Sequence, residues 1–151
     1  MSGHREPNLL AIKLGRTGDL TGSDAIAWST TRDTPYVPSP LLDGELLFLA
    51  KRTDGILSIV NAKTGKASVE AERLAGVNGM YASPVLASGR VYILGRDGGA
   101  VVLKSGEKVE VLATNKLNDK FDASPAIVGQ QLFLRGENLY CIAPTERADA
   151  K

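Results

Sequence analysis

Ser83-Pro84-Val85-Leu86-Ala87-Ser88-Gly89-Arg90-Val91-Tyr92-Ile93-Leu94 is the stretch that decides the fold of this 151-residue chain. It opens with Ser-Pro and an apolar pair, passes through a small polar turn, and ends in an apolar run with an aromatic residue. The same order of residues returns from Ser39 and from Ser124, so successive Ser-Pro steps lie 44 and 41 residues apart. Repeats of about 40 to 45 residues with four short strands each are typical of propeller blades.

Short apolar runs bounded by Gly, Asp, Asn and Ser predict thirteen strands along the chain. We therefore expect an all-β fold, an incomplete propeller of four-stranded antiparallel blades, with about three blades in the chain. The expected parts are a partial blade over 9–38 with a third and an outer strand, blades over 39–82 and 83–123, a partial blade over 124–143 and a disordered tail over 144–151. All of them belong to a single partial propeller spanning 1–151.

One segment has two interpretations. A run of good helix formers has apolar residues at helical spacing, namely Ala67, Ala71, Leu74 and Ala75. The corresponding stretch of the next repeat, Glu107 to Leu112, alternates Val109 and Val111 with charges, which indicates a strand. Because repeats share their structure, we expect a strand in both places.

The composition excludes several functional classes. The 18 basic and 17 acidic residues nearly cancel, so no field of one sign exists to attract nucleic acid. No apolar run approaches the eighteen or so residues that a membrane span needs. The polar start of the chain lacks the features of a secretory signal, so we expect a cytoplasmic protein as the sequence is written, or an extracytoplasmic one, such as a periplasmic one, if it is a fragment of a longer secreted protein.

The chain resembles a known class of repeats. Asn61-Ala62-Lys63-Thr64-Gly65-Lys66 after an apolar strand, together with the Ser-Pro openings, resembles pyrroloquinoline-quinone-type (PQQ-like) propeller repeats over about residues 9–143. The amino-acid sequence is most similar to C-terminal parts of large planctomycete-type propeller proteins and to the propeller of the outer-membrane protein assembly lipoprotein. In such repeats the outer strand carries a Trp that docks between blades; here Trp28 keeps that place and Val69 replaces it in the next blade.

The resemblance raises the question of quinone chemistry. Quinone-dependent dehydrogenases of this class hold the cofactor in a larger ring, with calcium and often a disulfide between adjacent cysteines. This chain has one cysteine, too few blades, and no dense cluster of Asp, Asn and Glu that would give calcium its six to eight oxygen ligands. We expect no cofactor and no enzymatic activity.

The residues that could suggest catalysis or phosphate binding are each explained by a structural role. His4 lies in the polar opening segment without oriented partners, which indicates an exposed histidine. Cys141 is flanked by apolar residues in a strand and is expected to be a buried small hydrophobe. The glycines of 95–99 are expected to form a hairpin, since no helix follows them to bind a phosphate.

The candidate binding residues precede the Ser-Pro steps, where the chain enters the innermost strands beside the central channel. Polar groups interleaved with aromatic rings there suit a partner peptide or a small polar ligand, and the candidates are Arg32, Asp33, Tyr36, Tyr81 and Asp122. A second, basic set recurs at the ends of the second strands, namely Arg52, Arg96 and Arg135. The alternative for the basic set is that it pairs with Asp54, Asp97 and Glu137 as solvated surface charge.

Three blades and a fragment leave apolar faces and strand edges open to water. We therefore expect a homodimer in which two half-rings close a six-bladed ring and exchange N-terminal strands, acting as a non-enzymatic scaffold for protein or ligand interaction. The alternatives are an enzyme or cofactor-binding ring with its site in the channel of the oligomer, and a sensor fragment of a larger protein. We expect no nucleic-acid partner and no membrane span.

Overall fold

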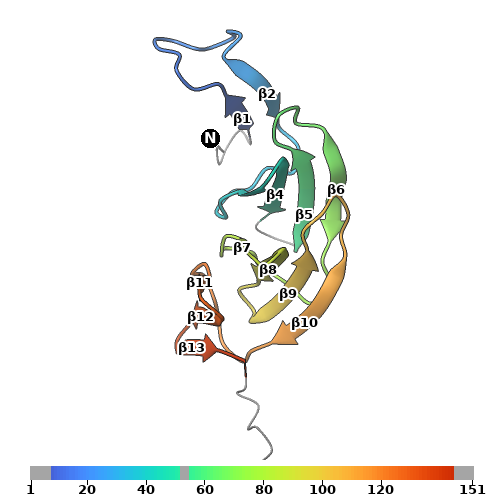
Figure 1. Ribbon diagram of the computed structural model, residues 1–151, viewed down its shortest axis with the longest axis vertical. Helices are drawn as coiled ribbons and strands as arrows, with labels where there is room; N and C mark the ends of the chain where they lie inside the picture. Colours follow the sequence, from blue (N-terminus) through green and yellow to red (C-terminus); the bar gives the residue numbers. More distant parts are fainter. Residues whose placement is uncertain (1–7, 52–54, 145–151) are drawn as a thin grey trace, which may run out of the picture.

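The computed structural model describes residues 8–51 and 55–144, and every regular element in that part of the chain is a β-strand (Figure 1). The strands are β1 (Leu9–Ile12), β2 (Ile26–Thr30), β3 (Leu41–Asp43), β4 (Leu46–Lys51), β5 (Ile56–Asn61), β6 (Ala67–Arg73), β7 (Val85–Ala87), β8 (Arg90–Leu94), β9 (Gly99–Lys104), β10 (Val111–Lys116), β11 (Ala126–Val128), β12 (Gln131–Arg135) and β13 (Leu139–Ile142). The predicted all-β class is confirmed.

The strands form four antiparallel meanders that follow one another in chain order. The first sheet is the pair β1-β2, the second is β3-β4-β5-β6, the third is β7-β8-β9-β10 and the last is β11-β12-β13. Figure 1 shows the sheets stacked along an arc, with the pair β1-β2 at one end, the last sheet at the other, and the outer strands β6 and β10 on the convex side. This arrangement is a partial β-propeller, as the repeat predicted.

The core lies between the sheets. We call the face that a sheet turns toward the next sheet in the chain its front, and the opposite face its rear. In the largest cluster, Phe48, Leu57 and Ile59 on the front of the second sheet pack with Val91 and Ile93 of the third. Because side chains alternate across a strand, each sheet divides cleanly into a front set and a rear set.

The same joint occurs twice more with different residues. Leu9 and Trp28 of the first sheet pack with Leu49 and Val60 on the rear of the second. Leu94 on the front of the third sheet packs with Leu134 on the rear of the last, around the buried ring of Phe121. Three joints therefore hold the four sheets, and in the described part of the chain no following sheet covers the front of the last one.

The two ambiguous segments behave differently from each other. Residues Ala67–Arg73 form strand β6, which confirms the strand interpretation over the helical one. In the next repeat the strand prediction from Glu107 was placed too early, because β10 begins only at Val111. The backbone N–H of Lys104 donates to the carbonyl of Glu110 at 3.0 Å, which closes residues 105–109 into a loop instead.

Candidate interaction site

The three Ser-Pro steps are linked to one another by hydrogen bonds between sheets. The backbone N–H of Ser39 donates to Oγ of Ser83 at 2.8 Å, and the N–H of Ser83 donates to Oγ of Ser124 at 2.9 Å. Within residues 8–51 and 55–144 this ladder stops at both ends, since Oγ of Ser39 receives no such donor and the N–H of Ser124 finds no such acceptor. The motif that marks each repeat is thus a joint between repeats.

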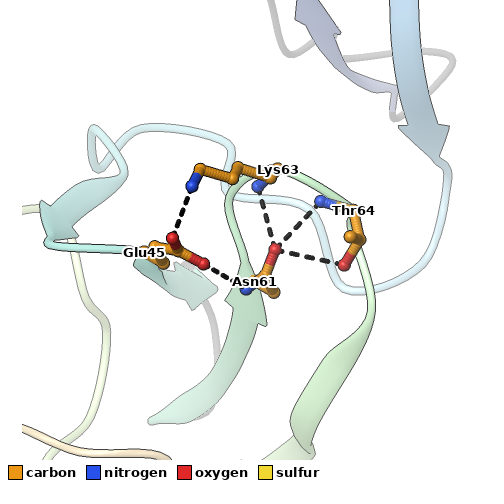
Figure 2. A network of polar contacts seen from close by, with 4 residues as sticks. All are labelled: Glu45, Asn61, Lys63 and Thr64. Carbon is orange, nitrogen blue, oxygen red and sulfur yellow. Dashed lines mark hydrogen bonds and ion pairs between the residues drawn. The ribbon is translucent and has the colours of Figure 1, made fainter.

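A second joint is built on the turn that follows β5. The side-chain oxygen of Asn61 accepts the backbone N–H groups of Lys63 and Thr64, both at 3.0 Å, and the hydroxyl of Thr64 (Figure 2). Glu45, from the turn before β4, contacts Lys63 and Asn61 from the other side. Hydrogen bonds from Lys63 and then from Asn61 hold the pKa of Glu45 below its ordinary value. The turn is therefore rigidly shaped by its own side chains.

Trp28 of the first sheet docks on this turn. Its indole Nε1 donates to the carbonyl of Ala62 at 2.9 Å. Gly65 lies under the ring, and a Cβ at that position would stand 2.7 Å from the indole Cδ2. In the loop after β9, a Cβ on Gly106 would meet nothing within 4 Å, so no described ring lies against that glycine.

The structure brings three of the candidate residues together on one loop surface. Nε of Arg96 lies 2.9 Å from one carboxylate oxygen of Asp122, and its terminal nitrogen lies 3.1 Å from the other. The same guanidinium carbon stands 4.7 Å from the ring centre of Tyr81. The pairing of Arg96 with Asp97 in the alternative interpretation is therefore wrong, because Asp97 is paired with Lys116 at 2.9 Å.

The other candidates lie apart from this cluster. Arg32 and Asp33 line a polar hollow of about 570 Å³ beside β6, and Asp33 is paired with Lys51 at 2.9 Å. Tyr36 is exposed over 42% of its surface. Arg135 ends β12 on the exposed side, and Glu137 follows it in a shallow hollow shared with Asp122. Arg52, Asp54 and His4 lie outside the described residues.

Asp119 is a residue that the sequence analysis did not single out. Its two carboxylate oxygens accept the N–H groups of Lys120, Glu137 and Asn138 and the hydroxyl of Tyr140, at 2.6 to 3.1 Å. These donors, the backbone N–H of Asn138 first, hold the pKa of the carboxyl well below its ordinary value. Asp119 thereby ties the loop before the last sheet to the β12-β13 hairpin.

The front of the last sheet differs from the other fronts because its side chains are exposed. Leu139 is 73% exposed, and Cys141 is exposed where the sequence predicted a buried hydrophobe. The prediction failed because, among the residues that the structure describes, no outer strand lies beside β13 and no following sheet covers the front. We call Val128, Phe133, Leu139 and Cys141 the open front face.

A hollow lies behind the same sheet. Its volume is about 370 Å³, and its walls are mainly apolar residues of the third sheet and of the last, including Leu94, Leu132 and Ile142. It lies beside β13, next to the place that a fourth strand occupies in each complete blade.

The described part of the chain holds neither a metal-binding cluster nor a membrane-spanning helix. In residues 8–51 and 55–144, no three or more His, Cys, Asp or Glu side chains gather in a way that could hold a metal ion. No helix in that part is long and apolar enough to cross a membrane.

Comparison with solved structures shows the fold. No family model matches the chain, and no curated protein matches it. Among solved structures it is similar to BamB from Moraxella catarrhalis, with 18% sequence identity and a TM-score of 0.68. The match covers 91% of this chain and 40% of that one. This likeness confirms the PQQ-like propeller fold that the sequence predicted, and the chain spans two-fifths of the length of its neighbour.

Proposed function

We propose that this chain is a non-enzymatic propeller scaffold that binds other proteins, and that its first partner is a second copy of itself. The open front face carries the proposal. Each of the three preceding fronts in the described chain is covered by the rear of a following sheet, whereas this one presents Leu139 and Cys141 to water. Apolar surface of this kind is stabilised by a partner.

The second copy offers the surface that fits. The rear of the second sheet, with Leu49 and Val60, is the surface that the front of the first sheet already covers in this chain. The last sheet resembles the sheets whose fronts are covered, because β11, β12 and β13 repeat the order of β3, β4 and β5 in the second sheet. One end of a chain can therefore pack on the beginning of another.

The blade count favours two copies. With β11-β12-β13 counted as one blade, a chain contributes three, so two chains give six, within the four to eight blades that propellers usually have. Two copies would span about four-fifths of the length of the BamB chain, so the proposed ring is smaller than that neighbour. A ring closed by a two-fold axis contains two identical joints.

The scaffold also presents a polar surface for a further protein. Tyr81 lies in the loop before β7, Arg96 in the β8-β9 hairpin and Asp122 in the loop before β11. They form one cluster, and Lys120 lines the hollows on both sides of it. Arginine and tyrosine are enriched at the centres of protein interfaces, so this surface is where we place a protein partner.

The test is the molar mass of the purified full chain by light scattering over a dilution series. The scaffold with a self-partner predicts a mass of twice 16.0 kDa that falls toward the single-chain value on dilution. A mass of 16.0 kDa at all concentrations would contradict the self-partner.

A further inference from the structure

The two end sheets of the chain are complementary in the strands they contain. The last sheet has first, second and third strands, and β1-β2 has a third and an outer strand. We propose that β13 of one copy replaces β1 of a second copy beside its β2, so that the last sheet gains the outer strand it lacks. This inference rests on the proposed self-association and specifies its joint.

The pairing registers place β1 and β13 at the same position of a blade. In the last sheet Leu132 pairs with Ile142, and in the second sheet Leu47 pairs with Val60. Ile142 is therefore the counterpart of Val60. In the first sheet, Ile12 is opposite Ile26 as Val60 is opposite Ala67.

The two pairings share one irregularity. The register shifts by one residue just before Ile12 in the first sheet and just before Val60 in the second, where a further shift lies between Leu57 and Ile59. Both β1 and β13 are four residues long and begin with Leu and end with Ile. In the exchanged joint Cys141 is therefore opposite Trp28 of the other copy, and Ile142 is opposite its Ile26.

The side chains of the two strands fit the same place. Leu9 is 7% exposed and packs on Leu49 and Val60. Leu139 stands at the matching position of β13 and is 73% exposed. After exchange Leu139 takes the place of Leu9 against the second sheet of the other copy, and one buried leucine replaces another.

The exchange gains contacts that the single chain does not make. The pairing of β13 with β2 replaces a β1-β2 pairing of equal length, so the strand hydrogen bonds roughly cancel. The gains are an outer strand beside the apolar hollow of about 370 Å³ and an acceptor for the N–H of Ser124. That acceptor is Oγ of Ser39 in the other copy, which continues the ladder of Ser39, Ser83 and Ser124 around the ring.

The site that receives β13 is already held in shape. Trp28 fixes β2 to the second sheet through the carbonyl of Ala62 and the backbone of Gly65, so β2 keeps its position when its neighbour changes. This preorganisation favours a second copy over an unrelated extended segment, because a free segment would lose conformational entropy on ordering.

The lone tryptophan and the lone cysteine of the chain report on this joint directly. Strands β2 and β13 lie at opposite ends of the arc in one chain (Figure 1). Donor copies carry Cys141→Ser and keep Trp28; acceptor copies carry Trp28→Phe and a small dye on Cys141 that absorbs indole emission. Mixed together, they should show strong energy transfer that rises with concentration in parallel with the mass. A control acceptor with Trp28→Phe and Cys141→Ser, labelled through Leu112→Cys on outer strand β10, should show much weaker transfer.

The outcomes separate the joint from the association. A doubled mass without energy transfer from Trp28 to the dye on Cys141 would overturn the exchange and leave the scaffold proposal standing. A single-chain mass of the unlabelled parent chain throughout would overturn both. Strong transfer together with the doubled mass supports both.

A second variant needs no label. Ala11→Pro weakens the pairing of β1 with β2, because proline cannot donate to the ladder. If β1 competes with β13 for β2, this variant should lower the dimer dissociation constant several-fold. A raised dissociation constant would show that β1 belongs to the joint and would overturn the exchange.

Discussion

The indole of Trp28 lies directly on the backbone of Gly65, so that a single added carbon at position 65 would overlap the ring. The two residues come from neighbouring sheets and are 37 positions apart in the sequence, a spacing close to the 34 that separates Trp28 from its acceptor Ala62. Gly65 also has a φ of 70°, in the region where side chains are strained. The contact therefore depends on glycine for two independent reasons.

Gly65→Ala and Trp28→Ala should be strongly coupled. Trp28 is half-buried, so its replacement by Ala should cost roughly 2 to 3 kcal/mol, below the 3 to 5 of a fully buried ring. Gly65→Ala should cost about 1 to 2 kcal/mol for its backbone angle alone, and an additional 1 to 3 or so from overpacking when Trp28 is present. Urea unfolding of the four chains of the cycle measures this. Additive costs would show that the ring does not dock on position 65.

Ser83→Ala should weaken the joint between the second and third sheets. The N–H of Ser39 loses its acceptor, and a net loss of about 1 kcal/mol is expected for one hydrogen bond. Ser29→Ala, on an exposed face of β2, is the matched control and should change the free energy of unfolding by less than about 0.5 kcal/mol. Equal effects of the two substitutions would mean that the Ser-Pro ladder contributes nothing to stability.

Asp119 should make the chain sensitive to acid. Its pKa is lower in the folded chain than in the unfolded one, since the N–H of Asn138 and the other donors favour the carboxylate. The stability it contributes is then complete above the unfolded pKa and is lost as the pH falls from about 4 through the lower folded value. Thermal melting of Asp119→Asn between pH 7 and pH 2 should show a smaller drop than the parent chain. Parallel curves would contradict this role.

The ion pair of Arg96 with Asp122 should matter little for folding. Both side chains are about half exposed, and pairs of that kind contribute less than about 1 kcal/mol. Arg96→Ala should therefore leave the melting temperature nearly unchanged while removing both the pair and the contact with Tyr81. A large loss of stability would show that the cluster holds the loops together and is not free to bind a partner.

The fold could be predicted from the sequence because each repeat consists of short motifs whose conformation depends on neighbouring residues. The Ser-Pro step, the small polar turn and the following apolar run each form within a few residues, so their recurrence predicts successive meanders. The start of β10 was misplaced because it depends on a backbone contact between Lys104 and Glu110, which the alternation of Val109 and Val111 does not reveal.

The site was harder to predict because it depends on which surfaces remain uncovered. Cys141 has apolar neighbours in the sequence and is exposed because no strand within residues 8–51 and 55–144 lies beyond β13. Arg96 pairs with Asp122, 26 residues away, and not with the adjacent Asp97, whose partner is Lys116 on a neighbouring strand. The role of Asp119 could not be predicted, because most of its donors, the N–H groups of Glu137 and Asn138 and the hydroxyl of Tyr140, come from a hairpin that only folding brings to it.

The mass of Leu139→Asp in solution, measured beside the parent chain and Leu112→Asp, tests whether a second copy covers the open front face. Both leucines are exposed, but Leu139 lies on the open front face and Leu112 on outer strand β10. If a second copy covers the open front face, Leu139→Asp should remain at 16.0 kDa at concentrations where the parent and Leu112→Asp have twice that mass. A Leu139→Asp chain that associates as tightly as the parent would contradict the account.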